Sequence, residues 1–166
     1  MRALGVDPGT ALLGYGVITV SASPRVVEFG ALATVPRQSM AERLQELYEG
    51  LDAVIRRAAP QVLAVEQLFF ARNVTTALAV GQARGIVLLL AAQHNLDVFE
   101  YKPNEVKLAV AGYGAADKAQ MQEMVRLQLE LAEIPRPDDA ADALALALCH
   151  VFSQRFHDFA RQGSMT

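Results

Sequence analysis

In Leu4-Gly5-Val6-Asp7-Pro8-Gly9-Thr10, near the start of the sequence, a short apolar strand runs straight into an aspartate, and the rest of the predicted fold is arranged around this segment. Pro8 fixes its own φ, and Gly9 can take the positive φ of a tight turn, so the chain turns just after the acid. The carboxylate of Asp7 is thereby held at the tip of a strand, where burial is costly unless the charge has a partner.

Two further segments deliver acids to the end of a secondary-structure element. Val62-Leu63-Ala64-Val65-Glu66 again ends four apolar residues with one carboxylate, and Asp138-Asp139-Ala140-Ala141-Asp142 opens an alanine-rich helix. Asp138 or Asp139 can share the helix face of Asp142, and either can also cap the helix. Spacing alone does not decide which of Asp138 and Asp139 shares the face of Asp142 and which caps the helix. Three separated acidic segments nevertheless favour a divalent-metal site.

The order of the predicted elements favours an α/β domain with a mixed five-stranded sheet flanked by helices. Strands are predicted at 2–7, 14–20, 26–33, 62–66 and 98–101, and helices at 39–58, 73–93, shortly after 103, 117–131 and 138–156. If the first and fourth strands are parallel neighbours, Asp7 and Glu66 reach the same crevice. We expect a single domain over 1–156 and a flexible tail over 157–166.

The composition, 52% hydrophobic and 20% charged, describes a folded globular protein. The chain has no secretory signal and no apolar run of the roughly 20 residues that span a bilayer, so no membrane association is expected. Its single Cys149 fits a reducing cytoplasm, where we expect the protein to act. The net charge of −3 weakly disfavours nucleic acid, but two bound divalent ions would reverse its sign.

The acids indicate Mg²⁺ or Mn²⁺ rather than zinc, because they are hard oxygen ligands without clustered His or Cys. Four carboxylates suffice for two ions about 3.5–4 Å apart, the arrangement that phosphoryl transfer uses. One ion would lower the pKa of an attacking water, and the other would neutralise charge on the leaving oxygen. A phosphodiester or nucleotide substrate follows, although Asp7-Pro8-Gly9 taken alone is also an ordinary turn.

Candidate contacts to nucleic acid lie beside these acids. Phe69 and Phe70 follow Glu66 in a predicted loop that also holds Arg72. These two phenylalanines either stack on an unpaired base or pack in the core. The lysines of the chain all fall between the last strand and the helix after it: Lys102, Lys107 and Lys118. They form either a solvated face or a grip on a phosphate backbone.

The predicted helix 73–93 is apolar nearly all round and must be covered on more than one side. Gly81 and Gly85 lie one turn apart and would permit close packing with another helix. We expect one side of this helix to cover the sheet and the other to meet a second subunit, with packing inside one chain as the alternative.

A set of motifs, in this order and spacing, resembles the RuvC family of Holliday-junction resolvases, the crossover junction endodeoxyribonucleases. The motifs are Asp7-Pro8-Gly9, Gly14-Tyr15-Gly16, Val65-Glu66-Gln67, Gln82-Ala83-Arg84-Gly85 and Asp139-Ala140-Ala141-Asp142-Ala143-Leu144. The resemblance implies a ribonuclease-H-like fold and a homodimer that resolves four-way DNA junctions by paired nicks. It also implies Mg²⁺-dependent hydrolysis with Mn²⁺ able to substitute, 5′-phosphate and 3′-hydroxyl ends, and a branch-migration partner of the RuvA and RuvB type.

Carried over residue by residue, the resemblance implies metal-binding and catalytic roles for four acids: Asp7, Glu66, Asp139 and Asp142. It thus selects Asp139 over Asp138. It also implies that Phe69 enters the centre of the junction and that Lys107 and Lys118 lie near the scissile phosphate. Arg72 stands where the family tends to have a basic residue.

Three other functions share parts of the pattern. An actin-like or sugar-kinase-like ATPase also has an Asp-x-Gly-Thr turn, but it needs a second similar domain that 166 residues cannot supply. A catalytically silent junction-binding protein would gain nothing from four acids. Another ribonuclease-H-like nuclease with a different nucleic-acid substrate stays open on the acids alone.

Overall fold

The computed structural model describes the backbone of residues 1–67 and 74–163 and the side chains of residues 1–67 and 76–154. Five strands form one mixed sheet in the order β3-β2-β1-β4-β5. Their bounds are β1 (Arg2–Asp7), β2 (Leu12–Thr19), β3 (Val26–Ala33), β4 (Val62–Glu66) and β5 (Asp97–Tyr101). β1, β2 and β3 pair antiparallel, whereas β4 is parallel to both β1 and β5, so the mixed sheet of the prediction is confirmed.

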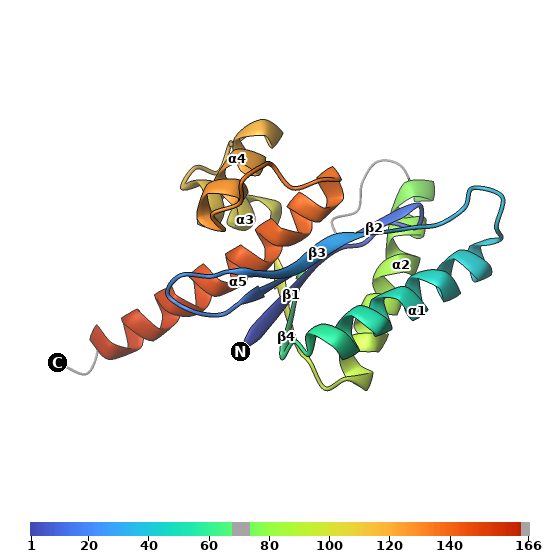
Figure 1. Ribbon diagram of the computed structural model, residues 1–166, viewed down its shortest axis with the longest axis horizontal. Coiled ribbons are helices and arrows are strands. Elements are labelled where there is room, and N and C mark those ends of the chain that lie inside the picture. Colours follow the sequence, from blue (N-terminus) through green and yellow to red (C-terminus); the bar gives the residue numbers. More distant parts are fainter. Residues whose placement is uncertain (68–73, 164–166) are drawn as a thin grey trace.

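Helices cover both faces of this sheet (Figure 1). α1 (Met40–Ala58) and α2 (Val74–Gln93) lie on one face, and α5 (Asp138–Gly163) crosses the other together with α3 (Pro103–Ala111) and α4 (Lys118–Gln128). Successive side chains of a strand point to opposite faces of the sheet, so the core has two separate halves. Leu4 and Val6 of β1 pack toward α1 and α2, whereas Ala3 packs toward α5.

Glycines let α5 lie directly on the strands. Gly5 of β1 and Gly16 of β2 are cross-strand partners beneath this helix. A Cβ at Gly5 would lie 1.9 Å from the carbonyl oxygen of Ala143, and one at Gly16 would lie 2.6 Å from a methyl carbon of Leu144. No real side chain tolerates the first distance, so this helix can approach the sheet only because residue 5 is glycine.

Three helices begin within a residue of their predicted starts, each at a residue that favours the start of a helix. Ser39 accepts a hydrogen bond from the backbone N–H of Glu42, whose side chain accepts one from the backbone N–H of Ser39, which makes a capping box for α1. Asp117 and Gln120 form the same reciprocal pair at the start of α4. Pro103 occupies the first turn of α3, where its missing N–H costs nothing.

Some predicted boundaries were wrong. β2 begins at Leu12 rather than residue 14, and α4 ends at Gln128 rather than residue 131, because the chain turns through a left-handed conformation at Glu130, with φ of 52°. α5 runs to Gly163 instead of ending near residue 156, since no glycine or proline interrupts the segment before Gly163.

Candidate active site

Two of the predicted acids end adjacent parallel strands. Asp7 is the last residue of β1 and Glu66 is the last residue of β4. The register that pairs Val6 with Val65 brings both acids to the same edge of the sheet. Each strand is an apolar run because it is buried on both faces, and the carboxylate appears at the first position where the strand leaves the core.

α5 brings the remaining acids to this edge from one face of the sheet. The backbone of Asp139 lies against Gly14 of β2, where a Cβ would lie 2.0 Å from the Asp139 carbonyl oxygen. Gly14 is also the cross-strand partner of Asp7. One glycine therefore joins the start of α5 to the end of β1, although its spacing in the sequence gave no sign of this contact.

A pocket of about 280 Å³ opens where these elements meet. It contains three of the four predicted acids and both lysines assigned to phosphate contacts, and its lining is Asp7, Glu66, Pro103, Val106, Lys107, Lys118, Met121, Asp142, Ala145 and Leu146. Asp139 is not part of this lining. A larger hollow of about 590 Å³ lies between β5, α3 and α5, but it is mainly apolar, and its Glu105 already caps α3.

The acids of the pocket repel one another across a partly buried space. Burial, followed by the negative charges of Asp142, Asp139 and Glu66, raises the pKa of Asp7 to about 7, against a smaller opposing effect of Lys118. Burial and the charge of Asp142 also raise the pKa of Glu66. The pKa of Asp142 is raised mainly by burial, although Lys118 acts in the opposite direction. Asp139 thus acts on the site through its charge while lying outside the lining of the pocket.

Lys118 lies beside these acids. Its Nζ lies 3.0 Å from Oδ2 of Asp138 and 3.9 Å from Oδ2 of Asp142. Asp138 also accepts hydrogen bonds from Gln122 Nε2 at 2.9 Å and from Arg136 Nη1 at 2.7 Å. These donors lower the pKa of Asp138, the hydrogen bond from Lys118 most strongly. Asp138 therefore serves as the anchor of Lys118, a role that spacing could not distinguish from capping.

The all-oxygen donor set and the raised pKa values fit a divalent cation, which would relieve the repulsion among the acids. Within the part of the chain that the structure describes, no three His, Cys, Asp or Glu side chains lie close enough together to hold one ion. The acids share one pocket, and their side chains must turn toward a common point before they can coordinate a metal.

Two residues of the predicted DNA interface, Phe69 and Arg72, lie outside the described residues. Lys107 lines the pocket and forms no salt bridge with any described residue. Lys102 is exposed and is not part of the pocket lining. The predicted lysine group thus divides into two lysines at the acids and one on the outer surface.

Sequence reasoning assigned no role to Arg84, which the structure places at this edge of the sheet. Its Nη1 donates a hydrogen bond of 2.7 Å to the backbone oxygen of Glu66. The signal that could have found it is a single charged residue inside an otherwise apolar helix, since such a charge needs a buried partner.

The family model and the sequence relatives point to one family. The family model described as "Crossover junction endodeoxyribonuclease RuvC" matches residues 3–150. A relative of that name from Chloroflexus aggregans is 59% identical over 161 residues, which cover 94% of this chain and 98% of the relative. One from Thermomicrobium roseum is 58% identical over 150 residues, which cover 90% and 92%.

Solved structures agree with the sequence relatives. RuvC of Thermus thermophilus, in complex with a Holliday junction substrate, superposes with a TM-score of 0.90 at 40% identity, over 95% of this chain and 96% of that one. The yeast mitochondrial Holliday junction resolvase gives a TM-score of 0.65 at 16% identity, over 96% and 85%. The second likeness shows that the fold is shared where little of the sequence is.

Proposed function

Because the chain belongs to the RuvC family of crossover junction endodeoxyribonucleases, we propose that it resolves four-way DNA junctions by paired, Mg²⁺-dependent nicks. As a member of that family it is a nuclease with a role in DNA recombination and repair. The observation that carries the proposal is the pocket shared by Asp7, Glu66 and Asp142 at the carboxyl ends of two parallel strands.

Asp7, Glu66 and Asp142, with Asp139 beside them, would hold two Mg²⁺ ions, and Mn²⁺ would be able to replace them. When bound, two such ions activate water and stabilise charge on the leaving oxygen of a phosphodiester, which here would leave 5′-phosphate and 3′-hydroxyl ends. The contribution of the chain is a rigid edge of sheet that holds the acids close together. Their mutual repulsion supports the proposal, because it disfavours the metal-free charged state.

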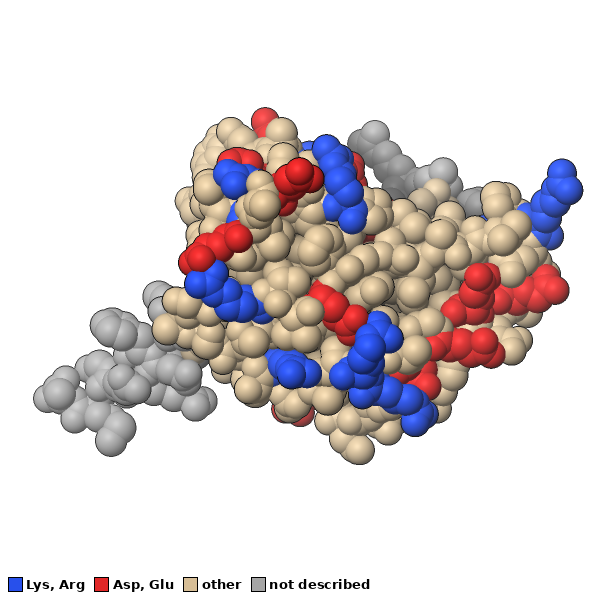
Figure 2. Space-filling view, in the orientation of Figure 1, with Lys and Arg blue, Asp and Glu red and all other residues tan. Residues whose placement is uncertain are grey.

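Lys107 and Lys118 would contact the DNA backbone beside the nick. Both line the acidic pocket, and Lys118 is more than half exposed, so a phosphate can reach it. Phe69 would enter the centre of the junction and Arg72 would bind a phosphate, which the order Glu66, Phe69, Arg72 along the chain supports. The DNA would approach the pocket rather than α1, which carries the exposed acids Glu42, Glu46 and Glu49. Figure 2 shows acidic side chains gathered over this part of the molecule, on the right of the view.

Paired nicks require two sites, and we infer that α2 supplies the interface of a homodimer. Leu78 and Leu89 on this helix are 63% and 50% exposed. Among the described residues, a Cβ at Gly81 or Gly85 would meet no neighbouring atom within 4 Å, which leaves room on this side of the helix for a second subunit. A branch-migration motor of the RuvA and RuvB type would be a further partner in the cytoplasm.

By length and composition alone, α2 would also qualify as a membrane-spanning helix. Over Thr76–Gln93 the helix is long and apolar enough to cross a membrane, with a mean hydropathy of 1.3 and 28% of the window buried. The buried part, with Ala83, Val87 and Leu90, packs in the core beside α1. A helix that lies partly in the core and partly in the proposed interface between subunits passes the same test of length and composition.

The deciding experiment compares the wild type with Asp7→Asn on a labelled four-way junction, with and without Mg²⁺. We expect paired nicks from the wild type only with Mg²⁺, and binding without cleavage from Asp7→Asn, with a nicking rate at least about a hundredfold lower. Asp97→Asn is the matched control, because Asp97 is an exposed aspartate at the opposite end of the sheet from the acids. Efficient cutting by Asp7→Asn, or cutting of the wild type in EDTA, would refute the proposed mechanism.

The same assay separates the remaining candidates. A nuclease for another nucleic acid would cut single-stranded, hybrid or linear duplex substrates at least as well as the junction. A silent junction-binding protein would bind without nicking even as wild type.

A further inference from the structure

Arg84 is the only Lys, Arg, Asp or Glu among the described residues that is buried, with 7% of its surface exposed. It lies in α2 between Ala83 and Gly85, and the core residues Ala83 and Val87 beside it are at most 1% exposed. A guanidinium in such a place is costly unless each side of its fork is paired. The groups that pair with the guanidinium therefore indicate the role of the buried Arg84.

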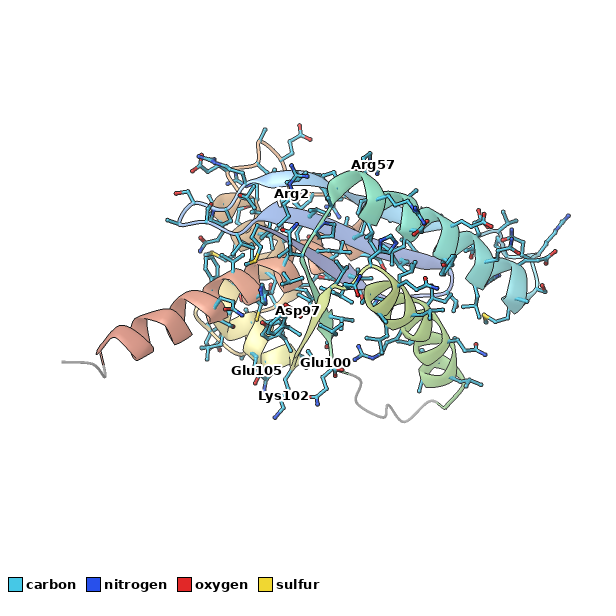
Figure 3. The ribbon with its side chains drawn as sticks, turned by 90° about the horizontal axis from the view of Figure 1, so that it is seen from below. Arg2, Arg57, Asp97, Glu100, Lys102 and Glu105 are labelled. Atoms are coloured by element: carbon cyan, nitrogen blue, oxygen red, sulfur yellow. The ribbon has the colours of Figure 1, made fainter. Side chains whose placement is uncertain are left out.

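The two ends of the guanidinium reach different strands. Nη1 donates a hydrogen bond of 2.7 Å to the backbone oxygen of Glu66, at the end of β4. Nη2 lies 2.8 Å from Oε1 of Glu100 on β5, a carboxylate that is 44% exposed. Figure 3 shows Glu100 close to the end of β5, in the same part of the molecule as Lys102. Arg84 thus joins α2 to the carboxyl ends of β4 and β5.

The contact with Glu66 fixes one particular peptide group. The carbonyl of Glu66 and the N–H of Gln67 belong to the same planar unit. The carbonyl accepts from Arg84, and the N–H donates to the carbonyl oxygen of Tyr101 at 2.8 Å. Since the ladder between β1 and β4 has its last pair at Val6 and Val65, strand pairing with β1 does not hold this carbonyl.

A peptide group held at both ends fixes ψ of Glu66 and hence the direction from which its carboxylate enters the acidic pocket. Mg²⁺ requires nearly ideal octahedral geometry, so small errors in the position of a ligand weaken binding. We propose that Arg84 is a positioning residue, which clamps the peptide group after Glu66 so that this carboxylate can serve the metal site. The inference rests on the proposed function, because metal binding by Glu66 is what the clamp supports.

The first test is Arg84→Lys, which keeps the positive charge but replaces the planar fork with a single ammonium that cannot reproduce both contacts. Mn²⁺ binding is measured without DNA, from the electron paramagnetic resonance signal of the free ion. Removing a group that orients a metal ligand typically weakens metal affinity by about 10–100-fold, and we expect at least about tenfold here. The Mg²⁺ concentration for half-maximal nicking shifts by the same factor, while junction binding in EDTA is unchanged.

The second test is Glu100→Gln, which removes the charge on β5 but leaves the hydrogen bond from Arg84 to Glu66. We expect Mn²⁺ affinity within about twofold of the wild type, even if the folded state is less stable. A tenfold loss of Mn²⁺ affinity in this variant would contradict the clamp even if Arg84→Lys does not fold, because the hydrogen bond from Arg84 to Glu66 is kept. Arg57→Lys is the matched control, since Arg57 forms a comparable pair with Glu28 at 2.8 Å between α1 and β3, away from the pocket.

Each outcome bears on the clamp. Wild-type Mn²⁺ affinity in Arg84→Lys would overturn it, and so would a loss in Glu100→Gln as large as that in Arg84→Lys. If Arg84→Lys lost junction binding in EDTA by the same factor as it lost Mn²⁺ affinity, Arg84 would support only the fold. That result would also overturn the clamp. Failure of the wild type to bind Mn²⁺ or to nick junctions would instead count against the proposed function.

Discussion

Gly14 of β2 and Asp139 of α5 are in backbone contact, so close that a Cβ on Gly14 would lie 2.0 Å from the Asp139 carbonyl oxygen. Gly14 also pairs with Asp7 across the ladder between β1 and β2. The approach of the start of α5 to β2 therefore depends on the absence of a side chain at residue 14, as its approach to β1 depends on Gly5. The geometry of the acidic pocket depends on that approach.

Gly14→Ala should displace the start of α5 and thereby misplace Asp139 and Asp142. We expect a loss of about 1–3 kcal/mol in the free energy of unfolding, the usual cost of overpacking, and a larger loss of junction nicking. Urea denaturation and a nicking assay measure the two effects. Gly114→Ala is the control, because a Cβ there meets no atom of the part of the chain that the structure describes within 4 Å, and φ is not in the left-handed region. Equal effects of the two substitutions would contradict the role of Gly14.

The raised pKa of Asp7 predicts how stability depends on pH when no metal is present. Folding moves this pKa from 3.8 to about 7, so the folded state binds the extra proton between these values. Stability is therefore greatest below about pH 4 as far as Asp7 is concerned, and it falls as pH rises toward 7, by on the order of a few kcal/mol. Urea denaturation in EDTA across this range should show a shallower fall for Asp7→Asn.

Mg²⁺ should reverse much of this loss above pH 7 in the wild type and little of it in Asp7→Asn, because the cation relieves the same repulsion. Asp97→Asn should behave as the wild type does. If Asp7→Asn and the wild type lose stability in parallel as pH rises, Asp7 does not titrate as its surroundings indicate.

Lys118→Met should weaken junction binding and slow nicking, because it removes the cation at the mouth of the pocket. If Lys118 contacts one phosphate, the slope of log Kd against log salt concentration should decrease by about one. Fluorescence anisotropy at several salt concentrations measures this slope. Lys102→Met is the matched control, since Lys102 is exposed outside the pocket. An unchanged slope for Lys118→Met would exclude a phosphate contact.

Leu89→Arg should weaken the proposed dimer, because it places a charge on the exposed apolar side of α2. Sedimentation at micromolar concentrations should find a wild-type dimer and a variant that dissociates at least about tenfold more readily. Leu127→Arg is the control, since Leu127 is a leucine of α4 with 51% exposure, close to the 50% of Leu89. A wild-type monomer at these concentrations would contradict the dimer.

The sequence predicted the sheet and the edge at which its acids lie, because both follow from local patterns. An apolar run that ends in one carboxylate is visible at Asp7 and at Glu66, and parallel pairing brings such ends together. The parts that could not be predicted depend on contacts between distant segments. Nothing near Gly14 in the chain indicates that Asp139 packs on it, and nothing near Arg84 indicates that its partners are Glu66 and Glu100.

The different roles of Asp138 and Asp139 also depend on contacts with a distant segment, which the sequence does not predict. Their positions in the helix are equivalent by spacing, and only the approach of α4 separates them, because Lys118 and Gln122 reach Asp138. The roles of Phe69 and Arg72 stay predictions from the resemblance. The end of α4 was missed for a local reason, since the left-handed turn falls on Glu130 and not on a glycine.

The assembly of acids from β1 and α5 has a consequence for the growing polypeptide. Asp7 is synthesised well before Asp142, so the pocket lacks Asp142 until α5 has been made and has docked on the glycines of β1 and β2. If this pocket is the proposed nuclease site, a chain that ends before α5 would be unable to cut DNA, because it would lack Asp142.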